Sequence, residues 1–199
     1  MPTSPDVLAE HTRRLLKTAA TLTETDLHAP SLCVGWSRAH VLSHLARNAE
    51  GLTRLARAAV DGTGETMYAG EAERSADIES WALLPRSGLL DTLAGTAAGL
   101  ADALARLRPE HDEIQVERTP GGRLFAARAL PGLRLREVVY HHVDLLAGFG
   151  FDDVEPDLVE RYLRSETDAA LAQDHEGRAQ ALLRLARAAD PAPPTVSAG

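Results

Sequence analysis

The segment LREVVYHHVDLLAG, residues 135–148, carries an acid and a histidine at helical spacing among apolar residues. Glu137 and His141 stand four residues apart, so their side chains project from one face of a helix. A carboxylate oxygen and an imidazole nitrogen are two of the three or four ligands that protein-bound Zn²⁺ uses. Burying the pair without partners would cost several kcal/mol. The two side chains are therefore expected to be exposed, paired with each other or bound to a metal.

A second histidine pair offers candidates for a further ligand. His40 and His44 also lie four residues apart, in the segment HVLSHLARNAEGLTRL, residues 40–55. Only His44 lies close to the apolar stripe that would face a helical core. His44 is therefore the preferred ligand, and a partly exposed structural histidine is the alternative interpretation for either residue.

Three other residues near these motifs have competing interpretations. His142 follows Glu137 by five residues, so its ring is expected to point away from the acid. Asp144 either orients His141 through a hydrogen bond or is a solvated acid or the partner of an arginine. Cys33 has no helix directly after it and no base nearby in the sequence, so it is not expected to be a nucleophile.

Residues outside these motifs receive structural interpretations. Trp36 is expected to anchor its loop to the core. Arg74 and Asp77 stand in an acidic, irregular segment, and their charges are interpreted as surface charge.

Composition limits the class of protein. The chain has 199 residues, 44% of them hydrophobic, which suits one domain with a small appendage. A net charge of −8 argues against nucleic-acid binding, because proteins that follow phosphates carry a basic face. One cysteine excludes an intrachain disulfide, and no apolar segment is long enough for a leader or a membrane span. The sequence therefore predicts a cytoplasmic protein with no membrane partner.

Helical periodicity, together with residues typical of helix ends, predicts a helical bundle. Ser4 and Pro5 start the first helix, and Ser37 is the expected N-cap of a second helix that Gly62 closes. Alternating polar and apolar residues predict a β-hairpin over residues 113–129. The other helices are expected at residues 72–81, 87–107, 157–173 and 176–189 and over the segment 135–148, which Pro131 precedes, with a loop at residues 28–36. Four long amphipathic helices predict an up-and-down bundle, which builds metal sites from facing helices.

Three segments together resemble a known family. They are SLCVGWSRAHVLSHLARNAEGL (31–52), YAGEAERSADIESWA (68–82) and LRLREVVYHHVDLLAGFGF (133–151). The chain resembles the mycothiol-dependent maleylpyruvate isomerase family, a branch of the DinB-like four-helix metalloproteins, over about residues 8–171. The resemblance implies an all-α, DinB-like four-helix bundle, and the hairpin predicted from the alternating residues lies between its third and fourth helices. It also implies that His44, Glu137 and His141 bind a divalent metal, with Zn²⁺ expected.

The resemblance also implies a reaction. Three protein ligands leave a position open for the thiol of mycothiol, whose pKa the metal would lower. The thiolate would add to the cis double bond of an electrophilic substrate such as maleylpyruvate and be eliminated after rotation. No protein nucleophile is needed, so no catalytic side chain is assigned beyond the metal-activated thiol. The expected activity is a thiol-dependent isomerisation or thiol transfer, and the residues that bind the thiol stay unassigned.

One departure from the family concerns the C-terminal part. Members carry a second, mixed α/β domain with a substrate-binding basic residue, and no such residue can be matched here. The expected division is a metal-binding bundle at residues 1–153, a helical extension at 154–190 and a disordered tail at 191–199. Inefficient isomerisation of maleylpyruvate is therefore expected. The alternatives are a non-enzymatic metal-binding or stress-associated protein and a regulatory protein that binds a partner, and a homodimer is left open.

Overall fold

The chain divides into two compact units, Met1–Gly150 and Phe151–Gly199. The computed structural model describes residues 4–189, with side-chain surroundings through residue 182. The predicted disordered tail, residues 191–199, lies outside the described residues, and the separate status of the C-terminal extension stays a prediction.

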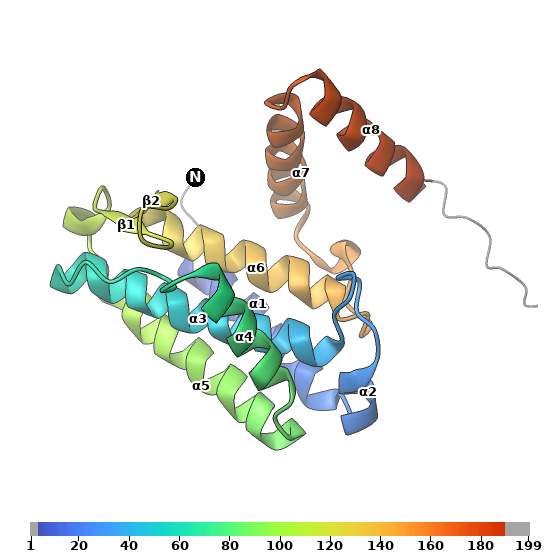
Figure 1. Cartoon of the computed structure of the whole chain (residues 1–199), viewed down its shortest axis with the longest axis horizontal. Helices are drawn as coiled ribbons and strands as arrows, with labels where there is room; N and C mark the ends of the chain where they lie inside the picture. Colours follow the sequence, from blue (N-terminus) through green and yellow to red (C-terminus); the bar gives the residue numbers. More distant parts are fainter. Residues whose placement is uncertain (1–3, 190–199) are drawn as a thin grey trace, which may run out of the picture. The chain divides into compact units, whose positions relative to one another are not determined.

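The first unit is a helical bundle that carries a small hairpin (Figure 1). Its α-helices are α1 (Pro5–Thr21), α2 (Glu24–His28), α3 (Arg38–Asp61), α4 (Glu71–Ala82), α5 (Arg86–Ala105) and α6 (Leu130–Asp144). Strands β1 (Gln115–Glu117) and β2 (Leu124–Ala126) pair antiparallel between α5 and α6, with Val116 opposite Phe125. The predicted fold class, an all-α four-helix bundle with a hairpin between the third and fourth bundle helices, is confirmed.

The four bundle helices do not follow chain order around the bundle. Helix α3 packs against α5 and α6, and α1 packs against the same two helices. The order around the bundle is therefore α1, α6, α3, α5, with α1 and α3 on one diagonal. Long connections make this possible, because α2 separates α1 from α3 and the hairpin separates α5 from α6.

Helix α3 is the most buried element and has a strong signal at each end. Ser37 and His40 form the capping box at its start, as the N-cap prediction required. Gly62 closes it in the left-handed conformation with φ 68°. At Gly51 an added Cβ would lie 2.7 Å from the Met67 side chain, so glycine allows the segment before α4 to pack directly on α3.

Helix α6 ends earlier than its apolar residues predict. The predicted helix runs through Gly148, whereas α6 ends at Asp144 and Leu146 has a positive φ of 50°. Arg38 explains the difference, because its Nε and Nη2 donate to the carbonyl oxygens of Leu145 at 2.6 Å and Leu146 at 3.0 Å. The backbone N–H of Leu32 also donates to the Asp144 carbonyl at 3.0 Å. These contacts satisfy the helix end and bring the loop before α3 against α6.

The second unit is helical as well. It contains α7 (Pro156–Leu171) and α8 (His175–Ala189), which contact each other. Leu163 and Leu171 on α7 are exposed, and an exposed apolar face is the feature on which the partner-binding alternative depends. Among the described helices, none is both long enough and apolar enough to cross a membrane.

Two glycine substitutions with opposite expected effects test the description of the helices. Gly62→Ala should lower the free energy of unfolding by about 1–2 kcal/mol, because alanine is strained in the left-handed region. Gly95 lies inside α5 at an exposed position with open space around it, so Gly95→Ala should raise the free energy of unfolding by about 0.5–1 kcal/mol. Urea unfolding of both variants measures the difference, and effects of the same sign would contradict the description.

Candidate metal centre

The structure brings the three sequence-predicted ligands together between two bundle helices. His44 comes from α3, and Glu137 and His141 come from α6. The Oε2 atom of Glu137 lies 2.8 Å from His44 Nε2 and 3.4 Å from His141 Nε2. One ligand atom from each residue lies within 4.8 Å of the other two. The carboxylate therefore faces the same type of nitrogen atom on each of two rings.

Burial and hydrogen bonding set the charges of this group. Burial acts to raise the pKa of Glu137, but its hydrogen bonds with His141 and His44 hold that pKa well below its usual range. His44 is only 6% exposed, and its burial lowers its pKa. This effect is larger than the opposite effect of the contact with Glu137, so the net pKa is lowered. Around neutral pH the carboxylate is thus ionised and the His44 ring is neutral.

His141 is held from both sides of its ring. Its Nδ1 lies 2.7 Å from Asp144 Oδ2, so Nδ1–H donates to that carboxylate while Nε2 faces Glu137. Burial acts to lower the pKa of His141, but the hydrogen bonds to Asp144 and Glu137 prevail and raise it to about 9. Of the two interpretations of Asp144, the structure supports the orienting contact. A proton fixed on Nδ1 leaves Nε2 as the nitrogen that can bind a cation.

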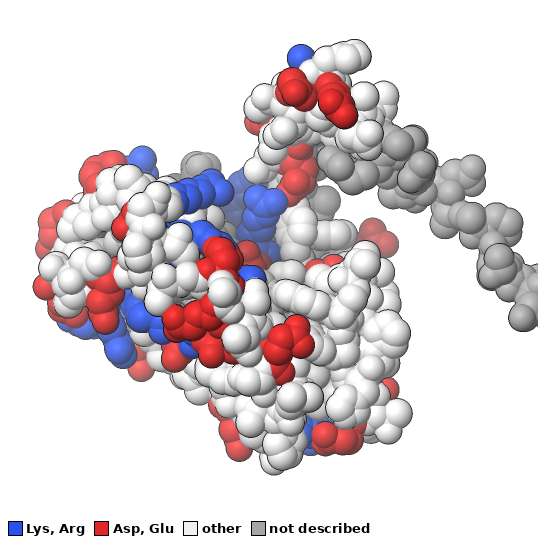
Figure 2. Space-filling model, in the orientation of Figure 1, with Lys and Arg blue, Asp and Glu red and all other residues white. Residues whose placement is uncertain are grey.

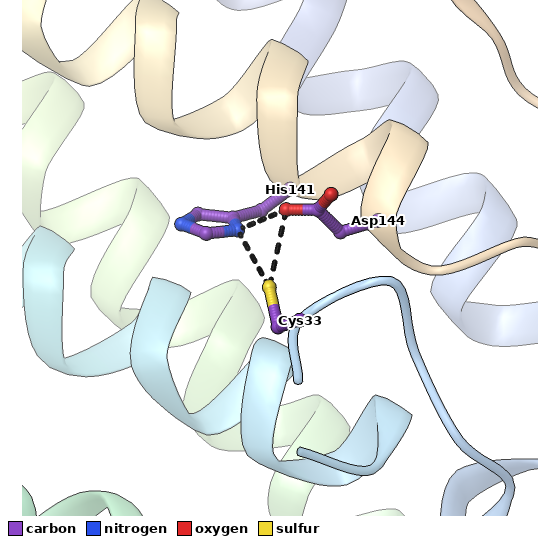
Figure 3. A group of neighbouring side chains, drawn as sticks. All are labelled: Cys33, His141 and Asp144. Atoms are coloured by element: carbon purple, nitrogen blue, oxygen red, sulfur yellow. Dashed lines mark hydrogen bonds and ion pairs between the residues drawn. The ribbon is translucent and has the colours of Figure 1, made fainter. Parts of the chain in front are cut away.

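Cys33 lies beside His141 and Asp144, which its sequence surroundings did not reveal (Figure 3). Its Sγ is 3.3 Å from Asp144 Oδ2 and 3.9 Å from His141 Nδ1. A histidine and a carboxylate therefore lie close to Cys33 in space although no base lies near it in the sequence. Burial, with the hydrogen bond to Asp144 and its charge, raises the pKa of Cys33 to about 12. The thiol thus stays protonated and donates to Asp144, on the side of the ring opposite Glu137.

Helix α4 supplies a cation that sequence reasoning missed. Arg74 Nη2 lies 3.0 Å from His44 Nδ1, so the interpretation of Arg74 as surface charge is wrong. Asp77 is not a free surface acid either, because it pairs with the buried Arg47. Acidic side chains gather over α4 in Figure 2, with basic side chains between them. Ion pairs of this kind, including Arg118 with Glu71, hold α4 and thereby place Arg74.

The two rival histidines lie elsewhere. His40 Nδ1 contacts Ser37 in the α3 capping box, and its Nε2 lies 3.2 Å from Glu79. His142 is 1% exposed, its Nε2 lies 2.8 Å from Thr18 Oγ1, and its ring stacks on Phe149 at 3.7 Å. Neither ring belongs to the group around Glu137, as their positions in the sequence predicted.

The donor set fits a divalent metal of the zinc type. Two imidazole nitrogens and one carboxylate oxygen are ligands that Zn²⁺ accepts, and three protein ligands are usual where a further position takes water or substrate. The Glu137 side chain is 33% exposed, so the group can be reached from solvent. Asp144 provides the outer hydrogen bond that metal-binding histidines almost always have.

Comparisons with known proteins point to one family. The family described as mycothiol maleylpyruvate isomerase N-terminal domain matches residues 8–146. Two crystal structures of the mycothiol-dependent maleylpyruvate isomerase, one of them of a His-to-Ala mutant, are 27% and 26% identical to this chain with a TM-score of 0.73. Each match covers 79% of this chain and 65% of the isomerase, so the chain spans just under two thirds of those proteins. A search of curated proteins found no match.

A more distant structure shares the fold. YfiT from Bacillus subtilis, described as a probable metal-dependent hydrolase with an unusual four-helix bundle topology, is 16% identical with a TM-score of 0.58. That match covers 71% of this chain and 80% of YfiT. At this identity the likeness concerns the bundle alone.

Metal content tests the ligand assignment, which stays a prediction. His44→Ala, Glu137→Ala and His141→Ala should each abolish stoichiometric metal in the purified protein, because two ligands rarely hold Zn²⁺ in competition with water. His40→Ala is the matched control, since His40 lies one turn before His44 on the same helix and outside the group. Elemental analysis of the four variants measures the effect. Full metal content in Glu137→Ala would contradict the assignment.

Proton release tests the charges of the group. His141 has a pKa of about 9 without metal, so at pH 7 it carries a proton that a cation on Nε2 must displace. Zn²⁺ binding at pH 7 should therefore release about one proton, and affinity should rise with pH until about 9. Calorimetric titrations in two buffers of different ionisation enthalpy count the proton. An affinity independent of pH between 7 and 9 would contradict this charge state.

The same raised pKa predicts how the metal-free fold depends on pH. A group whose pKa is higher in the folded than in the unfolded chain stabilises the folded state. This stabilisation is complete below the unfolded pKa near 6.5 and is lost as the pH rises through about 9. Asp144→Asn should weaken this loss, because it removes one of the two carboxylates that raise the pKa. Melting temperatures of both metal-free proteins between pH 6 and 10 measure it, and identical profiles would rule out the role given to Asp144.

Proposed function

The chain belongs to the mycothiol maleylpyruvate isomerase N-terminal domain family, and we propose on this premise that it is a divalent-metal-dependent enzyme. Its proposed activity is to activate a low-molecular-weight thiol, mycothiol, for attack on an electrophilic substrate. The observation that supports the proposal is the meeting of His44, Glu137 and His141 at a position open to solvent. Zn²⁺ is the proposed metal, because the donors are two imidazoles and a carboxylate.

Each residue of the group has a proposed part. When bound, the cation supplies a Lewis acid that lowers the pKa of a thiol so that thiolate forms near neutral pH. His44 and His141 present Nε2, and Glu137 adds a negative charge that offsets part of the charge of the cation. Asp144 keeps the proton of His141 on Nδ1 and so fixes the orientation of the ring.

The attacking sulfur is assigned to the small thiol rather than to the protein. Cys33 is the cysteine near the group, and its pKa of about 12 keeps it protonated. A neutral thiol is a poor nucleophile. The proposed role of Cys33 is to donate to Asp144 and help hold that carboxylate against His141.

Arg74 is proposed to bind an anionic group of the substrate. A histidine that offers its Nε2 lone pair to a cation carries its proton on Nδ1, so His44 Nδ1 can no longer accept a hydrogen bond. Arg74, which lies 3.0 Å from that atom, then needs another acceptor. A carboxylate is the acceptor that a guanidinium binds best. A substrate that is both an acid and an electrophile, such as maleylpyruvate, fits this arrangement.

Two electrophiles, one neutral and one anionic, test the proposal. With mycothiol and Zn²⁺, the protein should accelerate conjugation of monobromobimane and, less efficiently, the cis–trans isomerisation of maleylpyruvate, because no residue matches the substrate-binding basic residue of the family. His44→Ala and Glu137→Ala should abolish both accelerations, because both depend on the metal. If the metal-loaded protein accelerated neither reaction, the proposed function would be contradicted.

Arg74→Ala separates substrate binding from thiol activation. The variant should keep its metal and its rate with neutral monobromobimane, whereas its KM for maleylpyruvate should rise about tenfold or more because one charged hydrogen bond is lost. Arg106→Ala is the control, since Arg106 pairs with Asp61 at the C-terminal end of α3, outside the group around Glu137. An equal effect on both electrophiles would rule out the role of Arg74.

A further inference from the structure

A concave site lies on the first unit away from His44, Glu137 and His141. It is a groove of about 550 Å³ formed by α1, α5 and the start of α6. The groove exists because α5 presents small side chains toward α1 along this face. Its walls are mainly apolar and include Leu8, Leu16, Ala97, Leu100 and Leu104. A groove of this volume is in the range of small-molecule sites.

A buried arginine belongs to the lining of this groove. Arg134 is 2% exposed, and it lines the groove together with apolar residues. Its Nη1 donates to the Leu45 carbonyl and to Asn48 Oδ1, both at 2.8 Å. Its Nη2 is buried and has no hydrogen-bond partner. One side of the guanidinium is therefore satisfied by α3. Nη2 has unused donors but almost no exposed surface, so a ligand in the groove reaches it only when the side chains that cover it move aside.

The charge of Arg134 also lacks a direct counter-ion. Among the described residues no ion pair joins it to a carboxylate, and Glu137, one turn further along α6, acts on it only through the field of its charge. Burial lowers the pKa of Arg134 to about 10, so the group is still charged near neutral pH. A buried charge with unused donors is unfavourable unless an anion completes it.

We propose that this groove binds an aliphatic carboxylic acid, whose carboxylate accepts from Arg134 Nη2 and whose chain lies along the apolar walls of α1 and α5. The Arg134 end of the groove matches the carboxylate of such a molecule, and the apolar wall matches its chain. A free small anion would leave the leucine-lined wall unfilled, and an uncharged hydrocarbon would leave the guanidinium unpaired. Of the other charged residues in the lining, Asp6 is an exposed acid and Arg13 already pairs with Glu10, so Arg134 is the cation with unused donors.

Three probes separate the contributions of charge and chain. Decanoate should bind the full-length protein, as measured by calorimetry or by displacement of an environment-sensitive dye. Decan-1-ol has the chain without the charge, and acetate has the charge without the chain, so each should bind at least about tenfold more weakly than decanoate. Decanol that binds as tightly as decanoate would overturn the proposal and mark the groove as an apolar face for another partner.

Two variants place the binding in this groove. Arg134→Met removes the charge at similar length and should weaken decanoate binding about tenfold or more while leaving decanol unaffected. Ala98→Leu fills the groove from an exposed position on α5 and should weaken both, and it keeps the test valid if Arg134→Met does not fold. Ala20→Leu, an exposed position on α1 outside the groove, is the control. Unchanged decanoate binding in Ala98→Leu, or a loss in Ala20→Leu, would overturn the proposal.

Discussion

The contact between α3 and α6 through the Glu137 carboxylate is the interaction on which the rest of the site depends. An ionised carboxylate inside a bundle is unfavourable unless positive or hydrogen-bonding groups surround it. Two imidazoles do so here, at 2.8 Å and 3.4 Å from one oxygen atom. Because each helix contributes to the group, any sliding of α3 along α6 would separate the ligands. The contacts around the group therefore serve to fix the positions of these two helices.

Helix α6 is held in place by an unusually polar inner face. Arg134 donates to α3, His142 contacts Thr18 on α1, and the residues after Asp144 accept hydrogen bonds from Arg38. These contacts lie before, beside and after the ligand pair, and they involve both neighbours of α6 in the bundle. Directional hydrogen bonds set the register of a helix more sharply than apolar packing does, because a shift by one residue leaves buried groups unpaired.

The local signals were sufficient to predict much of this architecture. Spacing of four residues placed Glu137 and His141 on one helix face, and the cap residues Ser37 and Gly62 gave the ends of α3. The preference for His44 over His40 rested on the apolar stripe and on the family resemblance. Each of these predictions depends on a single helix, where residues close in the sequence are also close in space.

Features that depend on distant parts of the chain could not be predicted in this way. Cys33 and His141 are separated by 108 positions, and Arg74 reaches His44 from a helix whose own sequence resembles an exposed acidic segment. The end of α6 was mispredicted because Leu145 and Leu146 continue the apolar pattern, whereas the actual stop comes from Arg38 on another element. The order of the helices around the bundle likewise depends on which pairs pack, which periodicity does not specify.

X-ray absorption spectroscopy of the Zn²⁺-loaded protein, recorded before and after addition of mycothiol, tests the central claim most directly. We expect only nitrogen and oxygen neighbours of the metal at first, with an imidazole signature from two histidines. One sulfur neighbour at about 2.3 Å should then appear when the thiol is added. A spectrum without sulfur after the addition would contradict thiol activation by the metal. A sulfur neighbour already present before the addition would place Cys33 on the metal and contradict the ligand set of His44, Glu137 and His141.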